Sequence, residues 1–258
     1  MLLVLSPAKT LDYDSPKTTP ETSKPALMHR SAELIGQLQE LSPAAVATLM
    51  KISDPLAELN VQRYQAWSSR PAARNTRPAV LAFNGDVYDG LQASSLTDIQ
   101  LRYLQSHLRI LSGLYGVLRP FDLMQPYRLE MGIRLDHSTG RDLYSFWGDN
   151  VTDLLAESLA SQRDRTLVNL ASEEYFKVVR PARLQARIVT PVFEDWKNGQ
   201  YKVLSFFAKR ARGAMTRYAA QHGLKKPEGL QRFAVDGYQF DAAASTDTLW
   251  RFRRRMAD

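Results

Sequence analysis

The chain contains 258 residues, of which 44% are hydrophobic and 24% charged, with a formal net charge of +7 and no cysteine. This composition is typical of a globular protein of one or two domains, and no apolar run reaches the ~20 residues that a transmembrane helix needs. The absence of cysteine excludes disulfides, thiolate catalysis and cysteine-ligated metal centres. Because the N-terminus also lacks the pattern of a signal peptide, we expect a cytoplasmic protein without a membrane partner.

The positive charge is concentrated near the C-terminus. From Tyr201 onward the sequence has 12 Lys and Arg against 5 Asp and Glu, whereas the first 200 residues balance at 22 against 22. A basic excess in one segment is expected of a protein with an anionic partner such as nucleic acid. The alternative is a solvated surface that only keeps the protein soluble.

The first quarter of the chain is predicted to be mainly helical. A short apolar run, Leu2–Leu5, is typical of a buried strand, and a loop rich in proline, serine and threonine follows it up to Pro25. Ser42 before Pro43 has the pattern of an N-cap followed by a first-turn proline. Three helices are therefore predicted, over 26–41, 43–52 and 54–67, followed by a polar linker over 70–78.

Strands and helices alternate in the rest of the chain. Strands are predicted over 79–83, 108–111 and 166–170, and helices over 97–107 and 149–161. Asn198-Gly199 indicates a hairpin of strands 188–193 and 201–206; a helix over 207–222 and strands over 233–235 and 249–252 follow. This order predicts an α/β (mixed α+β) fold, with a central mixed sheet flanked by helices. We expect a single domain, 1–258, with an N-terminal helical hairpin subdomain inserted at about 26–67.

The segment Ile110–Gly132 begins as a strand and then contains five glycines and prolines that interrupt any regular period. An ordered loop of this length in a compact domain is usually functional. Its polar side chains could clamp a phosphate, hold a substrate, or fasten the loop to itself. The candidates for DNA or anion binding in this loop are Tyr115, Arg119, Tyr127 and Arg128, and Glu130 is a catalytic candidate.

Charged side chains also follow several predicted strands. Lys9 comes after the first strand, Asp86 lies in a glycine-bracketed loop after the strand over 79–83, and Lys177 follows the strand over 166–170. If these strands are parallel, their ends meet at one edge of the sheet, which is the usual ligand crevice. Lysines and carboxylates there can act in proton transfer or as nucleophiles. The alternatives are a surface lysine whose stem covers apolar groups and an Asx turn.

The helix predicted over 207–222 carries several cations. Lys209 and Arg212 can share one face, and Gly213 inside the helix would let a backbone, a ligand or a phosphate approach closely. Such clustered charge suits contacts to a phosphate backbone, which need no base-reading geometry. The alternative is a solvated cationic helix. The candidates for DNA or anion binding in this helix are Lys209, Arg210, Arg212 and Arg217.

Other chemistries lack a sequence signal. There is no P-loop, no dinucleotide-binding glycine pattern and no zincin helix. The four histidines have no ligand spacing. We therefore predict no cofactor and no metal site.

Several motifs together resemble the YaaA family of bacterial peroxide stress proteins, over nearly the whole chain. The most specific are Leu111–Pro120 and Gln125–Gly132, both inside the broken loop. The other matching motifs are Leu5–Leu11, Phe83–Tyr88, Phe146–Gly148, Asn169–Ser172 and Ala208–Gly213.

The resemblance implies a cytoplasmic bacterial protein of the oxidative stress response. It implies protection of DNA during hydrogen peroxide stress by limiting unincorporated intracellular iron. It also implies DNA binding, through a positive cleft and a helix-hairpin-helix-like element that would fall on Ile35–Ile52 here.

Two functions are weighed on these grounds. The first is a stress protein that binds double-stranded or locally unpaired DNA with little sequence specificity. The second is an enzyme that acts on DNA or a nucleotide-like substrate, in a cleft lined by the 110–132 loop, with Lys9, Asp86, Glu130 and Lys177 as its catalytic groups. Direct iron sequestration by carboxylates is disfavoured, because their spacing shows no site.

Overall fold

The computed structural model describes residues 1–16, 18–137 and 140–255. Its main sheet has the strand order β11-β12-β9-β8-β1-β5-β6, with β10 paired to β9. The five inner strands are parallel, and the additions at the edges are antiparallel. The predicted mixed sheet is thus confirmed. The strands are β1 (Leu2–Leu5), β5 (Leu108–Ser112), β6 (Gly116–Leu118), β8 (Thr166–Leu170), β9 (Arg187–Lys197), β10 (Gln200–Lys202), β11 (Gln239–Phe240) and β12 (Leu249–Arg254).

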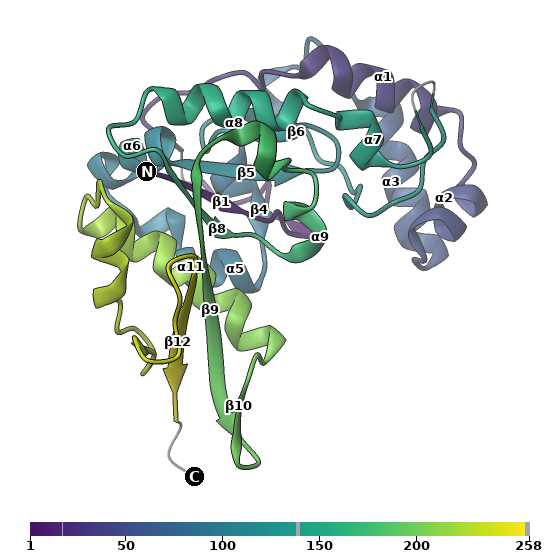
Figure 1. Cartoon of the computed structure of the whole chain (residues 1–258). Helices are drawn as coiled ribbons and strands as arrows, with labels where there is room; N and C mark the ends of the chain where they lie inside the picture. Colours follow the sequence, from purple (N-terminus) through teal and green to yellow (C-terminus); the bar gives the residue numbers. More distant parts are fainter. Residues whose placement is uncertain (17, 138–139, 256–258) are drawn as a thin grey trace.

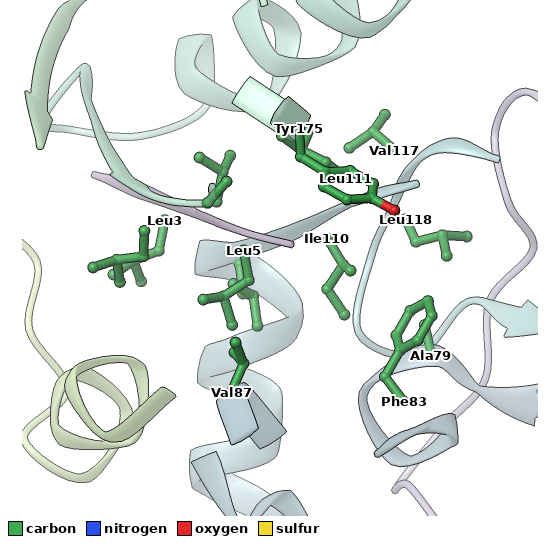
Figure 2. Packing of buried hydrophobic residues seen from close by; sticks show 14 of the residues in the cluster. Leu3, Leu5, Ala79, Phe83, Val87, Ile110, Leu111, Val117, Leu118 and Tyr175 are labelled. Atoms are coloured by element: carbon green, nitrogen blue, oxygen red, sulfur yellow. The ribbon is translucent and has the colours of Figure 1, made fainter. Parts of the chain in front are cut away.

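The centre of the sheet is buried on both faces. Every residue of β1 and β8 is buried, as expected for parallel strands covered by helices on both sides. Figure 1 shows α8 (Asn150–Ala160) on one face, and α5 (Asp86–Leu91) with α11 (Ser205–Gln221) on the other. In Figure 2, Val87 of α5 lies against Leu5, whereas Tyr175 lies on the opposite side near Leu111. The short α9 (Glu173–Phe176) and α10 (Pro181–Leu184) follow β8, and α6 (Asp98–His107) leads into β5.

The three helices predicted in the first quarter are present. They are α1 (Met28–Gln39), α2 (Pro43–Met50) and α3 (Asp54–Ala66), and Figure 1 shows them beside α7 (Leu143–Trp147), away from the C-terminal strands. Ser42 caps α2 as predicted, because its hydroxyl accepts a hydrogen bond from the backbone N–H of Ala45 at 3.2 Å. Ser53 precedes α3, but its side chain makes no capping hydrogen bond.

Some predicted strands are wrong. The segment over 79–83 is mainly the helical turn α4 (Ala79–Ala82), and only β4 (Phe83–Asn84) is extended, paired with β2 (Thr10–Leu11). A short, fully buried apolar run has no periodicity that separates a strand from a buried helix. The second hairpin strand ends at Lys202 because α11 begins at Ser205. Residues 233–235 are not a strand; they follow the 3-10 helix η3 (Pro227–Arg232).

Two predicted irregular segments contain regular structure. The residues after Gly85, expected as a loop, form α5. The 110–132 segment contains β6 and also β7 (Leu123–Met124), which pairs with β3 (Arg77–Pro78) from the predicted linker. The linker and the residues after α5 also hold the 3-10 helices η1 (Ala73–Asn75) and η2 (Ala93–Ser95). These short pairings fold the long loop back onto the body of the protein.

Candidate functional site

The carboxyl ends of β1 and β8 open into a cavity of about 410 Å³, which we call the strand-end cavity. The two strands are parallel, with Leu5 opposite Leu170, so the residues that follow them meet at one edge of the sheet. The backbone N–H of Ser172 donates to Ser6 Oγ at 2.8 Å and joins the two segments. The cavity is lined by Ser6, Pro7, Ala8, Lys9, Thr10, Asn84, Gly85, Asp86, Val87, Glu130, Leu170, Ser172, Glu174, Tyr175, Lys209 and Arg212.

Three cations line this cavity. Lys9 Nζ lies 3.3 Å from Glu130 Oε1, and Lys209 Nζ lies 3.9 Å from Asp86 Oδ2. Arg212 has no ion-pair partner within the part of the chain that the structure describes. Burial lowers the pKa of the Arg212 guanidinium, since desolvation disfavours its charged form. A partly buried cation without a counter-ion is a place where a bound anion would gain energy.

Glu130 faces the cavity from the 110–132 loop. Its Oε1 accepts hydrogen bonds from Arg128 Nε at 3.2 Å and Nη2 at 3.0 Å, in addition to the contact with Lys9. Its Oε2 is buried and has no hydrogen-bond partner among the residues that the structure describes. Buried carboxylate oxygens are normally paired, because an unmade hydrogen bond costs about 1–3 kcal/mol. Glu130 therefore carries unused acceptor capacity at the wall of the cavity.

The close crossing of α5 and α11 positions Lys209 and Asp86. A Cβ at Gly213 would lie 1.7 Å from Val87 O, and a Cβ at Gly90 would lie 2.0 Å from Arg210 O. Only glycine fits at either position, because the clash would be with backbone. The sequence left open whether Gly213 admits a backbone, a ligand or a phosphate, and the structure shows the backbone of α5. The two helices thereby place a lysine opposite an aspartate.

The 110–132 loop is held by buried hydrogen bonds within itself and with Trp67 at the end of α3. Tyr115 Oη accepts from Trp67 Nε1 and from the backbone N–H of Gln125, both at 3.0 Å, and burial raises the pKa of Tyr115 to about 12. Tyr127 Oη shares a 2.6 Å hydrogen bond with Ser112 Oγ. A Cβ at Gly113 would lie 2.1 Å from Leu129 O, so the loop also packs directly on itself. These contacts fix the backbone that carries Glu130.

Five of the predicted site residues line the strand-end cavity. A sixth, Arg128, does not line it but donates hydrogen bonds to Glu130. Of the three residues expected to meet at the strand ends, Lys9 and Asp86 line the cavity, although Asp86 follows β4 outside the main sheet, and Lys177 does not line it. The five residues are Lys9, Asp86, Glu130, Lys209 and Arg212.

The aromatic and lysine candidates that lie elsewhere have structural contacts. The rings of Tyr115 and Tyr127 are only 1% and 4% exposed, so neither can stack on a ligand without a change in the loop. Lys177 Nζ lies 4.8 Å from the centre of the Tyr144 ring, outside the residues that line the cavity. The place expected for Lys177 is taken by Glu174 of the same helix.

The remaining arginine candidates also lie away from the cavity. Arg119 Nη2 is 3.0 Å from Asp122 Oδ1 and donates to Lys24 O. Arg217 donates to Leu91 O, Gln92 O and Ser95 Oγ at the end of α5. Arg210 lies 3.5 Å from Asp236 and lines a separate cavity of about 650 Å³, whose lining also includes Asn84.

Sequence reasoning missed Glu174. Its Oε1 accepts from the backbone N–H of Gly132 at 3.0 Å. Together with Lys9 and Glu130 it also lines a neighbouring cavity of about 490 Å³, whose lining includes Lys51 at the end of α2. The signal was present, because Glu174 lies in the first turn of a helix that directly follows a buried strand. The neighbouring cavity joins the strand-end cavity to the helices of the N-terminal subdomain.

Neither a metal-binding cluster nor a membrane-spanning helix is present in residues 1–16, 18–137 and 140–255. No group of three or more His, Asp or Glu side chains there could hold a metal ion. None of the helices in these ranges is long and apolar enough to cross a membrane.

The fold and the cavity define a mixed α/β protein with an ionic cavity at the carboxyl ends of its parallel strands. The family model of the peroxide stress protein YaaA matches residues 1–244, and the chain belongs to this family. A UPF0246 protein of Janthinobacterium sp. (strain Marseille) is 63% identical over 256 residues, covering 99% of each chain. UPF0246 proteins of Cupriavidus pinatubonensis and Burkholderia multivorans are 61% and 55% identical, each covering 100% of both chains.

Proposed function

We propose that this peroxide stress family member is a cytoplasmic DNA-binding protein that limits free intracellular iron and oxidative DNA damage. The iron-limiting part follows from the family resemblance, and the DNA-binding part has a candidate site in the structure. The strand-end cavity gathers Lys9, Lys209 and Arg212 at one sheet edge. Phosphate groups would supply the negative charge that these side chains attract.

The observation that carries the proposal is Arg212. Its side chain is partly buried and has no carboxylate partner in the described part of the chain, whereas Lys9 and Lys209 each have one. A protein normally avoids an uncompensated buried charge. A phosphate bound beside Arg212 would remove this cost, and the neighbouring lysines would add weaker, screened attraction.

The test is fluorescence anisotropy with duplex DNA and with DNA containing an unpaired bubble, over a series of salt concentrations. Binding should weaken with salt, with a log–log slope of about −0.9 per phosphate neutralised. Arg212→Gln should reduce the slope by about one phosphate contact. Arg183→Gln is the matched control, because Arg183 lies on the surface with Asp149 and Asp153. No DNA binding at low salt, or equal effects of both variants, would refute the proposal.

A second candidate is an enzyme acting on DNA or a nucleotide-like substrate in the same cavity. Glu130 favours it: one carboxylate oxygen contacts Lys9, and the other is buried without a hydrogen-bond partner in the described part of the chain. This carboxylate is placed to take a proton from the Lys9 ammonium. The neutral amine could then condense with an aldehyde carbon of the substrate, with loss of water.

Reduction with borohydride would convert that C=N bond into a stable amine and trap the protein on DNA. The expected adduct disappears in Lys9→Ala and persists in Lys177→Ala, since Lys177 lies over Tyr144 instead. If wild-type protein forms no adduct with abasic DNA, or if Lys9→Ala still does, this candidate is rejected.

A further inference from the structure

The C-terminal strands form a ribbon that extends beyond the main sheet. β8 pairs with β9 only as far as Val189, and the rest of β9 pairs with β10 and β12. In Figure 1 this ribbon points away from both the helical subdomain and the body of the sheet. The ribbon carries charged and aromatic residues that do not line the strand-end cavity.

One face of the ribbon is buried. Phe193, Phe252 and Arg254 point to this side, where Arg254 Nε bonds Asp195 and Tyr238 Oη donates to Asp195 Oδ2 at 2.9 Å. Because side chains alternate along a strand, the residues between these lie on the opposite side. That side, which we call the ribbon face, carries Trp196, Tyr201, Arg253 and Arg255.

The residues of the ribbon face are stacked on one another. Trp196 lies opposite Tyr201 in the ladder, and their ring centres are 5.0 Å apart in an edge-to-face arrangement. The Arg255 guanidinium lies 4.0 Å from the centre of the Trp196 ring, and that of Arg253 lies 4.4 Å from Tyr201. Such contacts hold flat groups in place before a ligand arrives.

Trp196 is nevertheless exposed. It retains 39% of its accessible surface, whereas Trp67, Trp147 and Trp250 retain 8%, 0% and 2%. Tryptophan is normally among the best-covered residues. An exposed indole with a guanidinium stacked on it offers the kind of flat surface on which an unpaired base can lie.

The charge that is not compensated near the ribbon face is positive. Arg253 is paired with Glu194 and Asp241. Arg255 stacks on Trp196 and has no ion-pair partner within the described ranges. Lys197 and Lys202 have none there either, but they project from the other side of the hairpin, since Lys202 lies opposite Asp195. Cations beside an exposed aromatic ring are the combination used to bind single-stranded nucleic acid, with bases on the rings and phosphates on the cations.

We propose that the ribbon face binds single-stranded DNA, with a base stacked on the exposed ring of Trp196 and an adjoining phosphate near the Arg255 guanidinium. The choice of DNA rests on the proposed function, but the site is separate from the strand-end cavity. A duplex would not suit this face, because paired bases present no ring face to Trp196. The ribbon would therefore select unpaired segments, while the cavity holds phosphate.

The experiment follows intrinsic tryptophan fluorescence of the full chain during titration with an unlabelled thymidine dodecamer. Trp196 is the exposed fluorophore, so we expect quenching in wild type and its loss in Trp196→Phe. That variant keeps a ring and should bind a labelled dodecamer within about twofold of wild type. Trp196→Ala should bind about tenfold more weakly, since one base stack contributes about 1–3 kcal/mol.

The controls separate this inference from the proposed function. Ile99→Ala removes an apolar side chain that is 82% exposed on α6, and it should bind like wild type. Arg212→Gln should weaken duplex binding and retain quenching by the dodecamer. If Arg212→Gln weakens duplex binding while Trp196→Ala binds the dodecamer like wild type, only the ribbon inference fails. The reverse result would reject the cavity alone.

Two further outcomes would overturn the ribbon inference. Equal quenching by polyphosphate would show that the face responds to charge without bases. Concentration-dependent dimerisation that Trp196→Ala abolishes, measured by sedimentation without DNA, would assign the face to a second copy of the chain.

Discussion

The 110–132 loop and the strand-end cavity are both rich in polar side chains, yet they use them differently. In the loop, Tyr115, Tyr127 and Arg119 each bond to groups of the protein itself. In the cavity, Arg212 lacks a counter-ion among the described residues. Glu130, which the loop contributes to the cavity wall, keeps a buried oxygen without a hydrogen-bond partner among them. The loop is therefore interpreted as a support and the cavity as the place where a ligand completes the contacts. The loop and the cavity contain similar types of polar residue, and they differ in whether those side chains have a bonding partner in the protein.

The largest expected effect concerns the helix crossing that supports the cavity. Gly213→Ala places a Cβ against Val87 O, and relieving this backbone clash should lower the free energy of unfolding by about 3 kcal/mol or more. Denaturant unfolding measures the change. Gly36→Ala in α1 is the control, because no atom of the described residues that could clash lies within 4 Å of its added Cβ, and it should stabilise the protein by about 1 kcal/mol. Similar effects of the two variants would contradict the crossing as the cause.

The next effect separates the loop from the cavity directly. Asp122 is 1% exposed and accepts from Ser23 Oγ at 2.6 Å and from the Arg119 backbone N–H at 2.8 Å. Asp122→Ala should lower the free energy of unfolding by about 2–4 kcal/mol because donors lose their acceptor. Asp86→Ala in the cavity should change it by less than about 0.5 kcal/mol. Thermal or denaturant unfolding of both variants measures these changes. Equal losses of unfolding free energy in Asp122→Ala and Asp86→Ala would contradict the distinction between the loop and the cavity.

A smaller effect of opposite sign is expected at Arg212. Arg212→Met keeps the length of the side chain and removes an uncompensated, partly buried charge. We expect a gain of about 0.5–1 kcal/mol in the free energy of unfolding, together with weaker binding of DNA, as is common when a site residue is removed. A loss of stability would mean that Arg212 has a supporting role like that of Arg119.

The smallest effect is a pH dependence within the loop. Burial raises the pKa of Asp122 above its ordinary value, in spite of its hydrogen bonds with Ser23 and Arg119. The folded state then binds the proton more tightly than the unfolded state, so this contribution to stability is present at low pH and is lost as pH rises through the folded pKa. The difference in unfolding free energy between wild type and Asp122→Asn should decrease from about pH 4 upward. An increase over this range would show that the ion pair with Arg119 outweighs burial.

Local patterns predicted much of the fold. The fully apolar Leu2–Leu5 and the mostly apolar Thr166–Leu170 indicated buried strands, and the charged residues after them led to Lys9 and to the edge where the cavity lies. The same reasoning failed over 79–83, because a buried apolar run has no exposed face to set its period. It also chose Lys177 over Glu174, since the direction in which each side chain leaves a one-turn helix depends on packing against Tyr144.

The partners of the cations could not be predicted in most cases. Arg217 donates hydrogen bonds to carbonyl groups more than 120 residues earlier in the chain. Arginines of β12 form ion pairs with carboxylates on β9. These contacts depend on tertiary structure, which a count of basic residues does not contain. Arg119 is the exception: its partner Asp122 lies three residues away, so its supporting role could have been recognised from the sequence.

The hydrogen bonds from α3 to the 110–132 loop have a consequence for local unfolding. Tyr64 Oη donates to Arg128 O, and Trp67 Nε1 donates to Tyr115 Oη, so the end of α3 is fastened to the backbone that carries Glu130. Separating α3 from the body would therefore disturb the cavity wall, and a ligand that holds Glu130 should make that opening less frequent. Amide hydrogen exchange in the N-terminal helices would then report on occupancy of a cavity that these amides do not line.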